Sequence, residues 1–410
     1  MELINGHYQL QGISFPSLAR EFGTPLYIYD AAKIEQQVQN LKNAFPGLEV
    51  RIKFAAKALT NISILKLMKR NGIGIDVVSI QEAQIALKAG FSPREIMFTP
   101  NCVEFEEIVQ GVELGLIINL DNLPVLEQFG KKYGNSCPCG IRLNPHILAG
   151  GNLKISTGHS YSKFGISIQQ LPSLRQVVDN YHIHVAGLHI HTGSEIDDVG
   201  VFMKMAEILF GIARDFPTLQ FIDFGGGYKV AYKEGDKETD VNALGQNLKK
   251  LFDDYHRQVG NKPELWIEPG KYLVSEAGYL LVKTNVVKTT PTVTFAGVNS
   301  GLNHLIRPMM YDAYHGIVNV SNPGGALKQY TVVGNICETD TLGADRQLNE
   351  VREEDLLVIK NAGAYGYMMA SNYNSRLRPA EVLIVNGKAS LIRERDTLDH
   401  LLRGQIDIFG

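Results

Sequence analysis

The chain has 410 residues, of which 44% are hydrophobic and 20% are charged, and these ordinary proportions exclude a disordered, collagen-like or coiled-coil protein. Its 40 basic and 43 acidic residues give a net charge of −3, so no basic excess indicates a nucleic-acid partner. The 4 cysteines exclude a disulfide framework and fit a reducing compartment, and neither a signal-peptide pattern nor a long apolar stretch is present. We therefore expect a cytoplasmic protein with no membrane partner.

Strand and helix patterns alternate regularly over the first two-thirds of the chain. Short β-branched runs predict strands at residues 51–56, 75–78, 96–99, 116–120, 140–143, 184–191, 221–224 and 265–268. Apolar residues at helical spacing predict helices at residues 62–70, 81–88, 103–112, 124–132, 171–179, 201–213 and 241–257. This alternation indicates βαβ units and a parallel sheet.

The number of these units favours a closed barrel. Eight strands, with units of about 20 to 40 residues, are typical of a (β/α)8 barrel of the TIM type. A doubly wound open sheet remains the alternative, because periodicity alone does not separate the two folds.

The pattern changes after residue 268. Strands are predicted at residues 279–296, 328–334, 355–361 and 380–393, the last with a hairpin turn at Asn386-Gly387. We expect an α/β chain in which residues 25–270 form the barrel, while residues 1–24 and 271–410 form a β-rich domain.

The C-terminal ends of the barrel strands are where this fold builds its active sites. Lys57 follows the apolar run 54–56, where loss of water lowers the pKa of an amine and so favours a Schiff base to an aldehyde cofactor. A lysine that extends to solvent from a strand end is the structural alternative. Asp76 lies within the next strand.

The run Gly225-Gly226-Gly227 follows another strand end. Three glycines let backbone N–H groups close on an anion such as a phosphate, although a bare triple glycine also occurs in simple tight turns. No Gly-Lys-Ser/Thr follows, which excludes a P-loop.

His189 and His191 lie on one face of a predicted strand, and Glu268 ends the last barrel strand. No further ligand follows the histidines at close spacing, so we predict no metal site. One imidazole could stack on a flat cofactor, and a carboxylate at Glu268 could face a pyridine nitrogen. A structural histidine and a surface acid are the alternatives.

These motifs occur in one order: a lysine after the first barrel strand, His-x-Gly-Ser at 191–194, the triple glycine, and Glu-Pro-Gly at 268–270. Together they resemble the pyridoxal-phosphate-dependent decarboxylases built on the alanine-racemase-like barrel. The similarity is greatest to the diaminopimelate decarboxylases and extends from Thr24 to Leu398.

The resemblance implies pyridoxal 5′-phosphate as the cofactor. Lys57 would bind it covalently, His191 would stack on its ring and Glu268 would pair with the pyridine nitrogen. The other cofactor contacts that we expect come from Asp76, Ser194, Gly226, Gly227 and Tyr365.

For the substrate, the resemblance implies that Arg307 and Tyr311 hold the distal carboxylate. Cys337 would be the proton donor and Glu338 the ligand of the distal amine, both reaching the site from the partner subunit of a homodimer with shared active sites. Further substrate contacts are expected from Lys271 and Tyr365. The family usually has arginine at position 271, and lysine keeps the charge but loses the bidentate fork.

The resemblance therefore implies decarboxylation of meso-diaminopimelate to L-lysine, the last step of lysine biosynthesis. A decarboxylase of another basic amino acid or polyamine precursor (ornithine, arginine or carboxynorspermidine) is the first alternative. An amino-acid racemase of the same barrel type is disfavoured. The resemblance implies that racemases place an arginine at the pyridine nitrogen, whereas this chain has Glu268 there. A non-catalytic pyridoxal-phosphate carrier would lack the β-rich domain and the Cys337-Glu338 pair.

Overall fold

The computed structural model describes residues 1–151 and 156–409, and the chain divides into two compact units. The barrel unit comprises residues 36–231 and 237–273, and the sheet unit comprises residues 1–35, 232–236 and 274–410. Within the described ranges, no helix combines the length and the apolar character that crossing a membrane requires.

Eight parallel strands close into a ring in the barrel unit. In ring order they are β5 (Val50–Ala55), β6 (Gly74–Val77), β7 (Ile96–Phe98), β8 (Ile117–Leu120), β9 (Cys139–Asn144), β11 (Val185–Ile190), β12 (Phe221–Asp223) and β13 (Glu264–Ile267). The ring closes where β13 pairs with β5, through Ile267 and Ile52 among others. The short strand β10 (Ile166–Ser167) pairs with β9. The barrel prediction is confirmed, and an open sheet is excluded.

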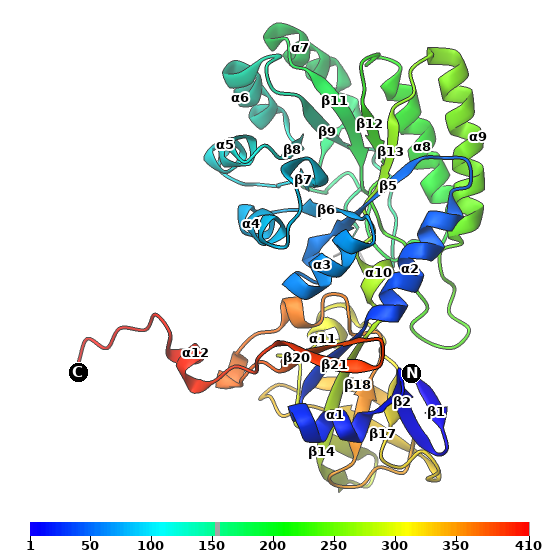
Figure 1. The fold of residues 1–410 in the computed structure, drawn as a ribbon, viewed down its shortest axis with the longest axis vertical. Coiled ribbons are helices and arrows are strands. Elements are labelled where there is room, and N and C mark those ends of the chain that lie inside the picture. The colour runs from blue at the N-terminus through cyan, green and yellow to red at the C-terminus, as the bar shows by residue number, and fades with distance from the viewer. Residues whose placement is uncertain (152–155, 410) are drawn as a thin grey trace. The chain divides into compact units, whose positions relative to one another are not determined.

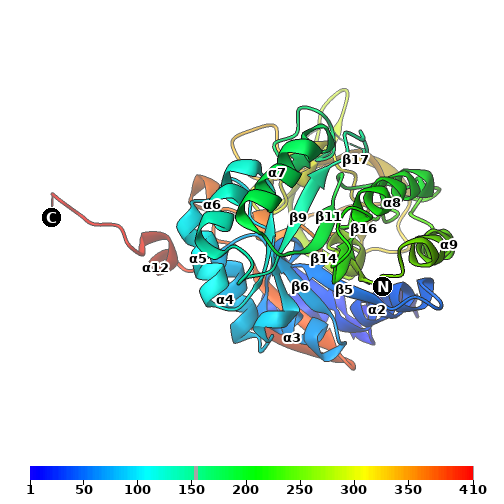
Figure 2. The same cartoon turned by 90° about the horizontal axis from the view of Figure 1, so that it is seen from above.

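Helices lie outside the barrel strands, as Figures 1 and 2 show. They are α2 (Ala31–Ala44), α3 (Ile62–Arg70), α4 (Ile80–Lys88), α5 (Phe105–Glu113), α6 (Leu123–Tyr133), α7 (Leu171–Tyr181), α8 (Val199–Ala213) and α9 (Val241–Val259). Side chains just before several helices bind free backbone N–H groups of the first turn: Asn61 accepts from Ser63, and Ser79 accepts from Glu82. Where such a cap is present, it fixes the start of the helix after the loop that leaves a barrel strand.

The sheet unit is built on a mostly antiparallel sheet. Its strands are β4 (Leu26–Asp30), β14 (Gly278–Thr289), β15 (Thr294–Val298), β16 (Ile317–Asn319), β17 (Leu327–Val333), β18 (Thr341–Asn349), β19 (Leu356–Ile359), β20 (Ala380–Val385) and β21 (Lys388–Arg393). A small sheet at the N-terminus contains β1 (Glu2–Ile4), β2 (His7–Leu10) and β3 (Ile13–Ser14). The sheet unit also contains the short helices α1 (Phe15–Phe22), α11 (Arg307–Tyr311) and α12 (Leu398–Leu402), while α10 (Lys271–Val274) spans the boundary between the two units.

The predicted hairpin turn is present between β20 and β21. Val385 pairs with Lys388, and the two residues between them, Asn386 and Gly387, have φ values of 50° and 73°. Positive φ at both central positions is what a type I′ turn requires, and Asn-Gly adopts it readily.

Several elements differ from the sequence interpretation, and three of them are instructive. β4, which we had placed with the barrel, pairs with β14 and β20 in the sheet unit, because a short buried run does not reveal which sheet it joins. β18 was not predicted, since most of its residues are polar or small, and its pairing with β17 holds it extended. α2 was not predicted either.

Candidate active site

Lys57 lies one residue into a short 3-10 turn, η1 (Ala56–Ala58), directly after β5. The apolar residues that precede it are buried, and Lys57 itself is half-buried. Thr60 Oγ1 donates a hydrogen bond of 2.6 Å to the carbonyl oxygen of Ala56, which fixes this turn before α3 begins. The amine is therefore carried by a rigid strand end.

The loop that follows β11 is hydrogen-bonded to the loop that follows β12. Ile196 N–H donates to Gly227 O at 3.0 Å, and Gly226 N–H donates to His191 Nδ1 at 3.2 Å. These bonds hold the segment that contains Ser194 against the glycine run. The arrangement presents backbone groups and one hydroxyl from two neighbouring strand ends.

The glycines of this run have no room for side chains. A Cβ atom on Gly226 would lie 2.2 Å from the carbonyl oxygen of Glu268, and one on Gly227 would lie 2.5 Å from the carbonyl oxygen of Gly193. Gly227 also has a φ of +109°, which other residues rarely adopt. The close approach of backbone segments is therefore built into the loop, as an anion-binding loop requires.

His191 is held as a neutral ring. Burial lowers its pKa well below the ordinary value, and the positive charges of Lys57 and Arg142 lower it further. Because Nδ1 accepts the Gly226 N–H, the single ring proton lies on Nε2. A neutral imidazole of fixed orientation is suited to stacking on an aromatic ring.

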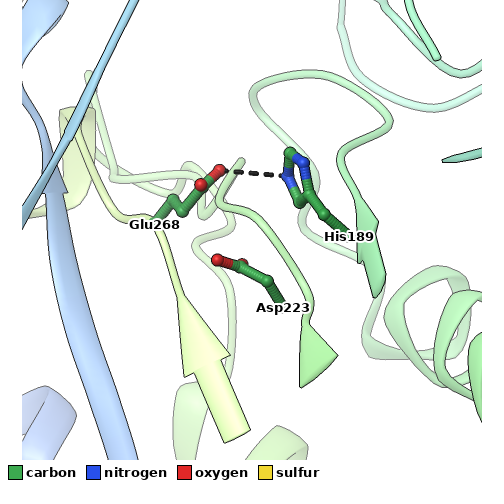
Figure 3. A group of neighbouring side chains, drawn as sticks. All are labelled: His189, Asp223 and Glu268. Carbon is green, nitrogen blue, oxygen red and sulfur yellow. Dashed lines mark ion pairs between the residues drawn. The ribbon is translucent and has the colours of Figure 1, made fainter. Parts of the chain in front are cut away.

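Three buried side chains from adjacent strands meet inside the barrel unit: His189 from β11, Asp223 from β12 and Glu268 after β13. Figure 3 shows them pointing toward one another. His189 Nε2 lies 3.1 Å from Glu268 Oε2, and Asp223 Oδ1 accepts the N–H of Gly225 at 2.8 Å. Glu268 Oε1 and Asp223 Oδ2 have no hydrogen-bond partner among the described residues.

The environment separates the protonation states of these acids. Burial and the nearby charge of Glu268 raise the pKa of Asp223 well above its ordinary value, and the same two causes raise the pKa of Asp76. Burial raises the pKa of Glu268 too, but the contact with His189 and the positive charge of Lys57 outweigh it and hold that pKa below the ordinary value. Of these three acids, Glu268 is the one favoured as a carboxylate.

This geometry fits a flat cationic ring that carries an anionic phosphate. Glu268 offers a buried carboxylate oxygen without a partner, the glycine loop offers an anion site, and Lys57 offers an amine. A metal ion is a second chemical use of the trio, since the ligand atoms of His189, Asp223 and Glu268 lie within 4.8 Å of one another. It would require Asp223 to ionise against its raised pKa, whereas a cationic ring requires no change of protonation.

Sequence reasoning missed several polar residues of the barrel interior. Asn119 in β8 lies 2.8 Å from His189 Nδ1, and Arg142 in β9 is buried with its guanidinium 4.7 Å from the Phe164 ring. Both point inward from strand interiors, so no strand-end signal marks them. Lys271, which we expected at the substrate, forms an ion pair of 2.7 Å with Glu195.

The remaining candidates lie in the sheet unit. Arg307 is 3% exposed and donates to His315 Nε2 at 3.1 Å, with its guanidinium 5.0 Å from the Tyr232 ring. Tyr311 ends the same helix, α11, and Tyr365 has a φ of 56°.

Cys337 and Glu338 are neighbours in an exposed segment of the sheet unit. Asn374 Nδ2 donates to Cys337 Sγ at 2.7 Å, and the Tyr373 hydroxyl donates to Glu338 Oε1. The structure therefore groups the expected cofactor residues other than Tyr365 in the barrel unit. It groups the expected substrate residues, apart from Lys271, in the sheet unit.

Comparisons with known proteins agree with this reading. A family model described as the pyridoxal-binding domain of pyridoxal-dependent decarboxylases matches residues 31–275. The diaminopimelate decarboxylase of Methanothermobacter thermautotrophicus is 38% identical, over 98% of this chain and 96% of the relative. That of Bacillus subtilis is 33% identical, over 97% and 95%.

Solved structures give the same result. Diaminopimelate decarboxylase of M. jannaschii in co-complex with L-lysine matches with a TM-score of 0.91 at 31% identity, covering 99% of this chain and 97% of that one. The Helicobacter pylori enzyme complexed with L-lysine matches with a TM-score of 0.88 at 31% identity, covering 95% and 98%. A lysine/ornithine decarboxylase of Vibrio vulnificus, at 20% identity and a TM-score of 0.79, shares the fold.

Proposed function

The chain belongs to the pyridoxal-dependent decarboxylase family, and within it to the diaminopimelate decarboxylases, and we propose that it converts meso-diaminopimelate into L-lysine and CO2. The observation that carries the proposal is the meeting of Lys57, the glycine loop and the buried carboxylate of Glu268 at the ends of the barrel strands. This constellation suits a pyridoxal phosphate and leaves the choice of amino acid to other residues.

We assign the cofactor's contacts to the barrel unit. Lys57 would hold it covalently, the loops of Ser194, Gly226 and Gly227 would bind its phosphate, and His191 would cover its ring. When bound, the cofactor supplies an electron sink for the bond that breaks. Asp76, whose carboxyl is buried and favoured in its neutral form, would adjoin the ring without adding a second negative charge.

The protein's own groups govern the protons. The Glu268 carboxylate would keep the ring nitrogen of the bound cofactor protonated by opposite charge. Neutral His191 adds no positive charge that would compete for that carboxylate. The Cys337 thiol would supply the proton that replaces the departing carboxylate on the substrate carbon.

Substrate choice would depend on the far end of the amino acid. Meso-diaminopimelate carries both an amine and a carboxylate there, and the chain offers Glu338 for the first and Arg307 with Tyr311 for the second. Tyr365 and Lys271 would complete the contacts. Ornithine or arginine would leave the Arg307 guanidinium without the carboxylate that it is proposed to bind.

We further propose a homodimer in which Cys337 and Glu338 serve the barrel of the partner subunit. Their exposure in the sheet unit supports this assignment, because a residue that acts in another subunit must lie at the surface of its own. A cytoplasmic location fits as well, since a reducing compartment keeps a catalytic thiol reduced.

The test compares substrates on the holoenzyme. We expect kcat/KM for CO2 release from meso-diaminopimelate to exceed that for ornithine and arginine by at least about 30-fold, because losing the substrate carboxylate opposite a buried cation costs about 2–5 kcal/mol. Arg307→Met should reduce this preference more than it reduces kcat with ornithine. A preference of the wild-type enzyme for ornithine or arginine would overturn the substrate assignment.

A further inference from the structure

The carboxylate of Glu268 has two unequal oxygens. Oε2 contacts His189 Nε2 at 3.1 Å, whereas Oε1 is buried and has no hydrogen-bond partner among the described residues. Figure 3 shows the His189 ring, which comes from β11, approaching the carboxylate of Glu268, which follows β13 on the far side of β12. One oxygen is thus in close contact with a protein nitrogen, and the other has no such contact.

His189 can hold Oε2 only if its Nε2 carries a proton. Both groups are buried, so a bare nitrogen facing the carboxylate would place two lone pairs together without water between them. The other ring nitrogen determines whether Nε2 is protonated, because a neutral imidazole carries a single proton. The partner of Nδ1 is therefore the decisive group.

That partner is Asn119. Its side-chain nitrogen lies 2.8 Å from His189 Nδ1, and Asn119 is completely buried in β8. An amide N–H can only donate, so it leaves Nδ1 as an acceptor and places the ring proton on Nε2. The reverse orientation of the amide would protonate Nδ1 and direct a bare Nε2, or a cationic ring, at Glu268.

The surrounding charges agree with a neutral His189. Burial lowers its pKa, the positive charges of Arg142 and Lys57 lower it further, and Glu268 acts in the opposite direction. Asp223, the third member of the trio, is favoured in its neutral form and does not compete for the ring proton. Although Nε2 lies 3.1 Å from Oε2, it forms no hydrogen bond among the described residues, and catalytic contacts often tighten into hydrogen bonds only when a ligand binds.

We propose that Asn119 and His189 are positioning residues: Asn119 sets the tautomer of His189, and His189 holds Oε2 so that Oε1 of Glu268 faces the ring nitrogen of the cofactor. This inference rests on the proposed cofactor site but not on the identity of the substrate. A purely structural histidine would fill the same space without controlling how tightly the cofactor binds.

The first test reads the tautomer directly in the holoenzyme labelled with 15N-histidine. At pH 7.5 the signal of His189, assigned by its loss in His189→Gln, should be that of a neutral ring with the proton on Nε2. In Asn119→Asp the carboxylate can only accept, so the ring proton should lie on Nδ1 and be donated to it. A wild-type ring that carries a proton on Nδ1 would overturn the proposal, whether or not the enzyme is active.

The second test measures the dissociation constant of pyridoxal phosphate. His189→Phe keeps an aromatic ring but no donor, and it should weaken cofactor binding about tenfold, the equivalent of one charge-assisted hydrogen bond. His189→Gln places an amide donor near the position of Nε2 and should recover most of the affinity. Equal affinities for wild type and His189→Phe would overturn the proposal.

His184→Gln is the matched control. His184 precedes β11 and is absent from the trio, so its substitution should leave the cofactor affinity unchanged. Melting temperatures of all variants identify any that fail to fold, and the wild-type spectrum, assigned with whichever His189 variant folds, then decides. If the enzyme prefers another amino acid, the substrate assignment fails. The tautomer and the cofactor affinity still test the roles of Asn119 and His189, because neither measurement involves the substrate.

Discussion

The carbonyl oxygen of Glu268 packs so closely against Gly226 that it lies 2.2 Å from the position a Cβ atom on Gly226 would take. The proposed phosphate loop and the proposed ring-nitrogen carboxylate are thus joined through the backbone. A change at one should disturb the other.

We therefore expect Gly226→Ala to weaken cofactor binding by about tenfold or more and to destabilise the fold by about 1–3 kcal/mol, the usual cost of overpacking. Titration with pyridoxal phosphate and urea unfolding measure the two effects. Gly211→Ala in α8 is the control, because its added Cβ meets nothing within 4 Å. If Gly226→Ala matches the control in both cofactor affinity and free energy of unfolding, the close packing of Gly226 against the Glu268 carbonyl is refuted.

Asp223 should make stability depend on pH in a defined direction. An acid whose pKa is raised by folding binds more protons in the folded state, so its contribution to stability falls as pH rises above the ordinary aspartate pKa. Asp223→Asn keeps an oxygen for the N–H of Gly225 and cannot ionise.

Relative to the wild type, the free energy of unfolding of Asp223→Asn should therefore increase between pH 5 and pH 8, by at most about 1.4 kcal/mol per pH unit. Urea unfolding after removal of the cofactor gives both values. A difference that stays constant or shrinks with rising pH would show that Asp223 is ionised in the folded protein.

Lys271 pairs with Glu195 at 2.7 Å, with 7% of the lysine side chain and 24% of the glutamate side chain exposed. Lys271→Met leaves the carboxylate without this partner and should cost about 1–3 kcal/mol of stability. Adding Glu195→Gln should recover part of that loss, and the double-mutant cycle measures the coupling. If the two losses simply add, the ion pair does not stabilise the fold.

Shared active sites predict complementation between inactive subunits. Lys57→Ala and Cys337→Ala homodimers should both be inactive, whereas a mixed dimer contains one intact site and one site that lacks both groups. A statistical mixture of equal amounts, in which half of the dimers are mixed, should recover about a quarter of wild-type activity. No recovery in dimers verified to be mixed would place Lys57 and Cys337 of one site in the same chain.

The sequence allowed prediction of those features whose signals are local. Barrel strands and helices alternate along the chain, and Lys57 and the triple glycine each follow directly after a strand. The His189–Asp223–Glu268 trio was not predicted as a unit, because its members are 34 and 45 positions apart and meet only when three strands pair. Asn119 was missed for the same reason, since a buried asparagine within a strand has no signal until its partner is known.

Reduction of the holoenzyme with borohydride, followed by peptide mass spectrometry, tests most directly where the cofactor is held. The barrel contains a rival amine at Lys53, which is buried and whose pKa is lowered by burial to about 8. We predict that the pyridoxyl mass is found on the peptide of Lys57 and is lost in Lys57→Ala. Labelling of Lys53 or Lys271 in the wild-type protein, with Lys57 unmodified, would contradict the account.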